Sequence, residues 1–195
     1  MVEVYRVQPD ARKCQWVLPD DPKFAEQGNL LFDGTSKSEE WNPPRFYLHA
    51  PNEEGVNFFI VAAGVFACDQ SVMDHPMMAM FFEMAGEVLP IELECGKQLY
   101  ILNTTEIVNA LDLEKSRFRK SPSTGIVVAV EQHIFKPERF TQSPIFKIPE
   151  TCRAQVLTFA GRFVNPEDEF LKNYFASEFS GLEFEKLWSS DTTAI

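Results

Sequence analysis

The stretch VLPIELECGKQLYILN, residues 88–103, has the pattern of a β-hairpin. Its first seven residues alternate in polarity, which puts Leu89, Ile91 and Leu93 on one face of a strand. The triplet CGK at 95–97 supplies the turn, and QLYILN supplies the second strand. The pattern predicts antiparallel pairing in the middle of the chain and favours a fold built on antiparallel sheet.

A polar run follows the hairpin directly and could be taken for the edge of an active site. Asn103 and Glu106 have the spacing of a helix capping box. Ile107, Val108 and Leu111 would then form the inward face of a short helix. Because each polar group has a structural role at the end of an element, we interpret this run as a junction between a strand and a helix.

Two longer helices are predicted. The first covers 72–86, with Asp74 as its cap and one apolar face made of Met73, Met77, Met80, Phe81 and Met84. The second begins at Asn165-Pro166 and turns four residues to the core: Phe170, Leu171, Tyr174 and Phe175.

Further strands are expected on both sides of the hairpin. Their ranges are 2–7, 57–67, 125–135, 144–149, 155–164 and 182–188. We therefore predict one α+β domain over residues 1–195, with mostly antiparallel sheets and a few short helices packed on one face. Residues 1–68 form its looser part, rich in strands and turns, and residues 69–190 form its core.

Composition and charge limit the classes of function that the chain can have. The chain has 195 residues, of which 45% are hydrophobic, so it can bury a core without disulfides or metal. Its net charge of −11 argues against nucleic acid as a partner and favours a basic protein, although acidic domains are also common for solubility alone. The start of the chain does not resemble a signal peptide, and the longest apolar run is about half of a membrane helix.

The cysteines carry no recognisable motif. Cys14, Cys68, Cys95 and Cys152 are too widely spaced for a zinc site or a small disulfide scaffold. We expect them to be reduced and buried, and the protein to be cytoplasmic and to have no membrane partner.

No sequence motif of an enzyme is present. The phosphate loop, the dinucleotide fingerprint, HExxH and the serine nucleophile elbow are all missing. Two weaker arrangements stay open: Glu131 with His133 on one strand face, and Cys68 with His75 as a thiol and base. We expect no catalysis, no cofactor and no metal.

The run GEVLPIELECGKQLYILNTTEIVNALDLEKS resembles the middle of immunity-protein family eleven of bacterial polymorphic toxin systems. SPIFKIPE and the closing SEFSGLEFEKLW are similar to later segments of that family. One departure is SVMDHPMMAMFFEMAGE, where the family has a more charged helix. The signature positions are of structural type: Pro90, Gly96, Asn103, Asp112, Gly181 and Trp188.

The resemblance implies a protein that neutralises a cognate toxin by occlusion, without catalysis. The toxin would be encoded by the adjacent gene, would be secreted or delivered by contact (as in type VI secretion), and would carry a basic domain such as a nuclease. The residues predicted to bind it are Glu39, Glu40, Trp41, Glu53, Glu54, Glu167, Asp168 and Glu169.

Each acidic cluster can also be explained as a solvated charge run or a helix start. Two other functions remain open: an adaptor or chaperone-like partner of a secreted effector, and a small hydrolase. Whether the chain forms a homodimer is also left open.

Overall fold

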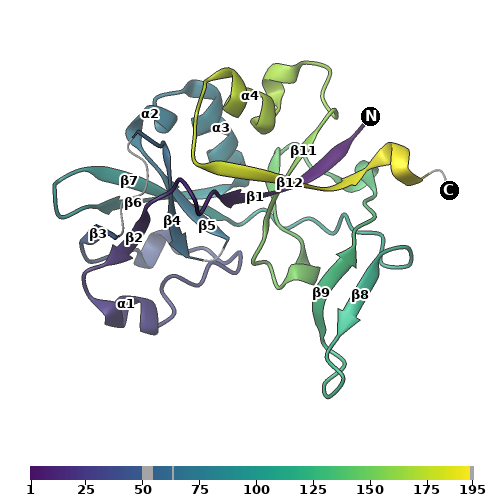
Figure 1. The fold of residues 1–195 in the computed structure, drawn as a ribbon, viewed down its shortest axis with the longest axis horizontal. Coiled ribbons are helices and arrows are strands. Elements are labelled where there is room, and N and C mark those ends of the chain that lie inside the picture. The colour runs from purple at the N-terminus through teal and green to yellow at the C-terminus, as the bar shows by residue number, and fades with distance from the viewer. Residues whose placement is uncertain (50–54, 63, 194–195) are drawn as a thin grey trace.

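The computed structural model describes residues 1–49, 55–62 and 64–193, which form a single α+β domain (Figure 1). Its described strands make a six-stranded sheet, a four-stranded sheet and a two-stranded hairpin. Strands that neighbour each other in the sheets are mostly antiparallel, as the sequence predicts.

The six-stranded sheet has the order β3-β2-β4-β5-β7-β6, and only β2 and β4 pair in parallel among these described strands. The predicted hairpin is confirmed, since Leu89 lies opposite Ile101 and the N–H of Gly96 donates to the carbonyl of Leu93 in the turn. The strands are β2 (Trp16–Pro19), β3 (Phe46–His49), β4 (Phe58–Ala62), β5 (Val65–Cys68), β6 (Gly86–Glu92) and β7 (Gln98–Thr104).

The four-stranded sheet joins the beginning of the chain to its end. Its order is β10-β11-β1-β12, so the first strand lies between two strands of the last quarter of the chain. The strands are β1 (Glu3–Pro9), β10 (Ile145–Phe146), β11 (Val156–Ala160) and β12 (Leu182–Ser189). The remaining strands, β8 (Arg117–Lys120) and β9 (Val127–Gln132), pair with each other and project from the domain as a hairpin arm (Figure 1).

The helices are short. Helices α2 (Gln70–Met73), α3 (Pro76–Ala85) and α4 (Phe170–Ala176) gather at one end of the molecule, while α1 (Pro22–Glu26) lies at the other (Figure 1). The 3-10 turns are η1 (Ser38–Glu40), η2 (Pro137–Arg139), η3 (Pro149–Thr151), η4 (Pro166–Asp168) and η5 (Ser190–Thr193). No helix among the described residues is long and apolar enough to cross a membrane.

The predicted helix after the hairpin is wrong. Ile107 pairs with Lys147 and Leu111 pairs with Phe135 through isolated β-bridges, so this backbone is extended. Asn103 does not cap a helix, because it belongs to β7. Long-range pairing has overridden the local capping pattern.

The strand predicted over 57–67 is also wrong, because the chain turns back within it. Gly64 has a φ of +71°, and the flanking segments pair antiparallel as β4 and β5. Both strands of this hairpin are almost wholly buried.

The predicted face of the helix over 72–86 is rotated from the observed one. Helix α3 buries Met78, Phe81, Phe82 and Ala85, whereas Met80 and Met84 are exposed. Its cap is His75 rather than Asp74.

Two smaller expectations about burial also fail. Phe175 of α4 is 62% exposed, although Phe170, Leu171 and Tyr174 are buried as predicted. The cysteines are expected to be buried, but only Cys14 and Cys68 are, whereas Cys95 and Cys152 are exposed.

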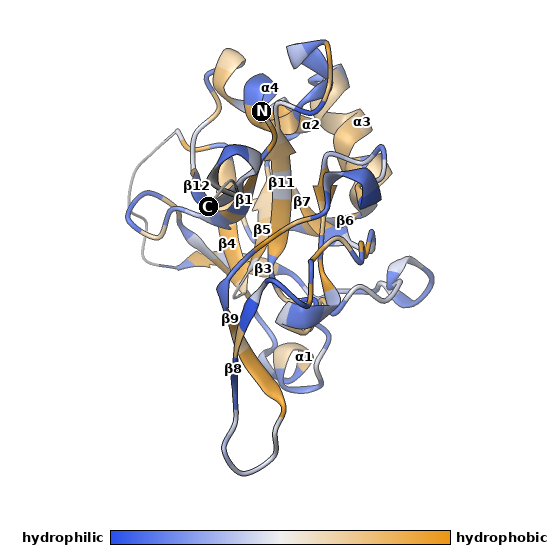
Figure 2. Cartoon of the chain, turned by 90° about the vertical axis from the view of Figure 1, so that its right-hand side faces the viewer, coloured by the Kyte–Doolittle hydropathy of each residue, from blue (hydrophilic) through white to orange (hydrophobic). Residues whose placement is uncertain are grey.

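Phenylalanine fills the interior. Apolar residues lie along the inner strands in Figure 2, while the connecting loops are largely polar. The fully buried phenylalanines are Phe46, Phe58, Phe66, Phe81, Phe82, Phe146, Phe159 and Phe170. Burial of such large side chains is the main stabilising term of the fold.

Gly181 and Gly96 both have a left-handed backbone conformation, but only Gly181 is crowded, so comparing them distinguishes backbone strain from crowding. Gly181 has a φ of +108°, and a Cβ there would lie 2.9 Å from the carbonyl oxygen of Phe58. Gly96 has a φ of +82°, and a Cβ added there would have no described neighbour within 4 Å. We expect Gly96→Ala to cost about 1–2 kcal/mol of unfolding free energy from the backbone alone. Gly181→Ala should cost about 3 kcal/mol or more, because crowding adds to that strain. Urea denaturation of both variants tests this, and equal losses would contradict it.

Candidate protein-binding site

The loop at 33–38 is fixed by the carboxylate of Glu87 on β6. This carboxylate accepts hydrogen bonds from the backbone N–H of Lys37 at 2.8 Å, from the hydroxyl of Ser38 at 2.7 Å and from the hydroxyl of Ser36. A further bond comes from the side-chain amide of Asn103 at 2.8 Å. Partial burial by itself raises the pKa of Glu87, but these donors outweigh it and lower the pKa to about 2.

Asn103 ties the same loop to β7. Its side chain is fully buried, and its amide also donates to the carbonyl of Thr35 at 2.9 Å. One amide therefore links the loop, β6 and β7. The Asn103 side chain helps to fix the path of the loop instead of capping a helix.

Lys147 holds the start of the loop from the other side. Its side chain is 1% exposed, and its ammonium donates to the carbonyl of Phe32 at 2.7 Å. Burial lowers the pKa of Lys147 to about 8, and the nearby carboxylate of Asp33 partly opposes this shift. The loop is thus held by polar side chains of β6, of β7 and of the segment after β10.

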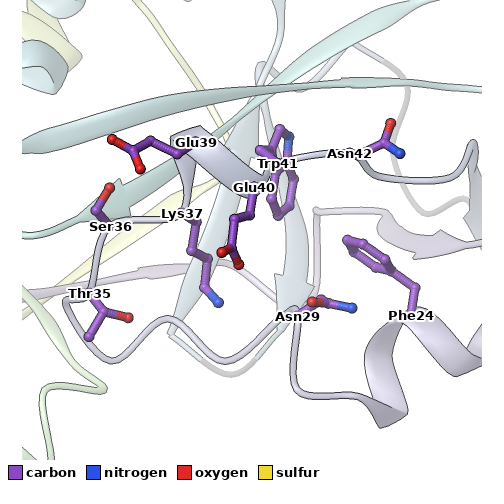
Figure 3. A pocket seen from close by; sticks show the side chains of 9 residues that line it. All are labelled: Phe24, Asn29, Thr35, Ser36, Lys37, Glu39, Glu40, Trp41 and Asn42. Atoms are coloured by element: carbon purple, nitrogen blue, oxygen red, sulfur yellow. The ribbon is translucent and has the colours of Figure 1, made fainter.

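Trp41 follows this loop and lines a pocket with a volume of about 500 Å³. Its indole N–H donates to the carbonyl of Pro90 at 2.9 Å, and its ring meets Phe24 of α1 edge to face at 5.8 Å. The bond and the ring contact fix the half-buried indole, so Trp41 is held in one orientation. The pocket is lined by Phe24, Asn29, Thr35, Ser36, Lys37, Glu39, Glu40, Trp41 and Asn42 (Figure 3).

Glu39 and Glu40 directly precede Trp41 in the chain. Glu39 and Glu40 are exposed, and neither forms an ion pair within the described ranges. In Figure 3 the side chains of Glu40 and Lys37 point to the same side of the pocket, while Glu39 points away from it. An aromatic ring beside free carboxylates suits a cationic side chain, which can stack on the ring and pair with an acid.

Five other residues are predicted to contact the toxin. Glu53 and Glu54 are outside the described residues. Glu167 is exposed and Asp168 partly exposed on η4, next to α4. Glu169 is 2% exposed and accepts the backbone N–H of Arg162 at 3.0 Å, so its carboxylate holds its own loop.

Figure 1 places α4 and α1 at opposite ends of the molecule. The acids near α4 therefore do not share a surface with Trp41, which packs on α1.

The two arrangements considered for catalysis are not assembled as catalytic pairs. Burial raises the pKa of the Cys68 thiol far above its usual value, so little thiolate forms. His75 caps α3 and bonds the hydroxyl of Ser177 at 3.0 Å instead. Glu131 is exposed, whereas the ring of His133 stacks on Phe135 with centroids 5.9 Å apart and burial lowers the pKa of His133.

A second hollow, of about 760 Å³, lies beside β9. Three buried polar atoms on its walls have no hydrogen-bond partner in the described part of the chain: Nε of Arg6, Nε2 of His133 and Oε2 of Glu150. These atoms lie where the hairpin arm meets the four-stranded sheet.

The signature residues of the sequence resemblance have structural roles. Pro90 supplies the carbonyl that binds Trp41, and Gly96 makes the hairpin turn. Asp112 accepts the backbone N–H groups of Glu114 and Lys115 and pairs with Lys136 at 3.4 Å.

The two C-terminal signature residues, Gly181 and Trp188, also have structural roles. Gly181 packs its backbone against Phe58, and Trp188 is 6% exposed against Phe135. These positions specify the fold and do not by themselves indicate a partner.

The chain matches no protein-family model, and the comparison with curated proteins gives no match either.

The Glu87 network gives a prediction for stability against pH. The folded-state pKa of about 2 lies below the ordinary value of 4.5, so the stabilisation is complete above pH 4.5 and is lost as the pH falls towards 2. That shift corresponds to at most about 3 kcal/mol.

We expect Glu87→Gln to lower the unfolding free energy at pH 7 by about 2 kcal/mol, and the difference from wild type to shrink as the pH falls to 2. Glu92→Gln is the control, because Glu92 lies on the same strand and pairs with Arg45 only at the surface, at 3.6 Å. A pH-independent difference for Glu87→Gln would contradict the assignment.

Proposed function

We propose that the protein is an immunity protein of a bacterial polymorphic toxin system, and that it binds and neutralises a cognate toxin by occlusion. The observation that carries the proposal is a fixed Trp41 on a pocket that it shares with Glu40, whose carboxylate has no ion pair among the described residues, next to a loop held by Glu87, Asn103 and Lys147. A rigid aromatic anchor next to free charge is typical of residues that dominate protein interfaces.

The charge of the chain supports a basic partner. With 29 acidic against 18 basic residues, the net charge is −11, and such a field accelerates encounter with a cationic domain. A basic nuclease-type toxin domain fits this chemistry. The resemblance of residues 86–116 to the immunity family points in the same direction.

The pocket also indicates how a partner would be bound. A volume of about 500 Å³ is enough for one or two side chains of a partner. A lysine or arginine of the toxin would place its alkyl stem against Trp41 and Phe24 and its charge near Glu40. In this role the protein needs no nucleophile, cofactor or metal.

An adaptor role is the second candidate, because α3 exposes two methionines. Met80 is 40% exposed and Met84 is 38% exposed on the same helix. Methionine suits an adaptable apolar contact with a secreted effector. An adaptor would bind the toxin without protecting cells from it, whereas an immunity protein does both.

The binding test uses purified protein and a catalytically inactive form of the toxin encoded by the adjacent gene. Trp41→Ala should weaken binding about 100-fold, as expected for an interface anchor. Reversal of Glu39 and Glu40 to lysine should mainly slow association and reduce its dependence on salt. Titration calorimetry and surface plasmon resonance measure both effects.

Reversal of Glu167 and Asp168 to lysine is the matched control, since it changes the same number of charges at the other end of the molecule. We expect its affinity to change less than about threefold. Equal losses for the two double variants would show that net charge, and not the Trp41 pocket, controls binding. Cells that die of the toxin while expressing the wild-type chain would refute the immunity function.

A further inference from the structure

Parts of the chain that are far apart in the sequence surround the hollow of about 760 Å³. One wall is β9 with the residues on either side of it, the second is η3 with the loop that follows, and the third belongs to β1 and β12. The volume is within the range of about 300–1,000 Å³ that small-molecule sites have. The hollow shares no lining residue with the Trp41 pocket, so it is a separate cavity.

The three buried polar atoms of the hollow that have no partner among the described residues differ in what they need. Nε of Arg6 can only donate a hydrogen bond, whereas Oε2 of an ionised Glu150 can only accept one. Nε2 of His133 does either, depending on which ring nitrogen carries the proton. The atoms lie on neighbouring walls, since η3 runs alongside β9 and the charge of Arg6 reaches the ring of His133. Because nearly all buried polar groups in folded proteins have a partner, they favour a ligand with both a donor and an acceptor.

The charges around the hollow favour a cationic ligand. Its two basic residues, Arg6 and Lys186, each already form an ion pair. Two carboxylates of the lining, Glu131 and Glu150, have no ion pair in the part of the chain that the structure describes. His133 adds no charge at neutral pH, because burial and the charge of Arg6 lower its pKa. An ammonium group would therefore be attracted, whereas a further carboxylate would be repelled.

An aliphatic surface lies beside these polar groups. Ile126 is 62% exposed and Val128 is 56% exposed on the β9 wall, and Leu187 of β12 also lines the hollow. Water alone could satisfy the polar atoms but would leave these side chains uncovered. A ligand with a short aliphatic group covers them and is favoured by the removal of apolar surface from water.

We propose that the hollow binds the free amino end of a peptide whose first residue is aliphatic. The terminal ammonium group donates to the carboxylate of Glu150, and the first peptide carbonyl accepts from Nε of Arg6. The first side chain packs against Ile126 and Val128, and the rest of the peptide leaves through the side of the hollow that is open to solvent. A free amino end carries a cation, an acceptor and an aliphatic side chain within a few bonds of one another.

Other small molecules match less of this lining. A free amino acid brings a carboxylate that Glu131 and Glu150 repel, and a phosphate group brings still more negative charge. An alkylamine has the cation and the aliphatic group but lacks the acceptor that Nε of Arg6 requires. An acetylated peptide keeps the carbonyl and loses the cation.

A titration of the isotope-labelled full chain, followed by nuclear magnetic resonance, tests the proposal with leucyl-alanine amide as the probe. We expect a dissociation constant on the order of 1 mM and chemical-shift changes centred on β9 and η3. N-acetyl-leucyl-alanine amide, isoamylamine and free leucine should each bind at least about tenfold more weakly. Equal affinity for the acetylated peptide, or shift changes only outside the hollow, overturns the proposal.

Variants test the residue that holds the ammonium group. Glu150→Gln should weaken binding of the probe at least about tenfold, because it removes the charge that the ammonium group pairs with. Glu138→Gln is the matched control and should bind like wild type. Glu138 takes the same second position in the 3-10 turn Pro137–Arg139 as Glu150 does in its own turn, but it is exposed and does not line the hollow.

The aliphatic wall gives a second, independent variant. Val128→Ser should weaken binding several-fold, since Val128 is exposed and its replacement removes apolar contact without adding charge. Circular dichroism checks that each variant is folded. Equal affinity of folded Glu150→Gln and Glu138→Gln overturns the proposal, and so does a wild type that fails to bind the probe at about ten times the expected dissociation constant.

Discussion

The carboxylate of Glu87 is the interaction on which the candidate site depends. It is partly buried, so it must receive hydrogen bonds, and its donors include the backbone of Lys37 and the hydroxyls of Ser36 and Ser38. Because these donors are consecutive along the chain, satisfying one carboxylate fixes the path of the whole loop. Trp41 follows directly, and its indole then reaches the carbonyl of Pro90 on the strand that carries Glu87.

The sequence predicts the elements whose signal is local. The hairpin of β6 and β7 follows from alternation and a glycine turn, and both are contained in sixteen residues. The helix expected after Asn103 fails because Ile107 and Leu111 pair with residues about 40 and 24 positions away, which no local pattern records. Helix α3 is apolar on most sides, so its packing partners, and not its periodicity, decide which face is buried.

The residues of the candidate site also fall into those that the sequence reveals and those that it does not. Trp41 with its acidic neighbours could be recognised from the sequence, because the pattern is contiguous. The role of Glu87 could not be recognised, because its donors Lys37 and Ser38 lie about 50 residues earlier in the chain. The strand that carries Glu87 shows only the usual alternation of apolar and polar residues. Lys147 did leave a signal, a single cation between Phe146 and Ile148 in an apolar segment, and its burial against Phe32 explains why it is there.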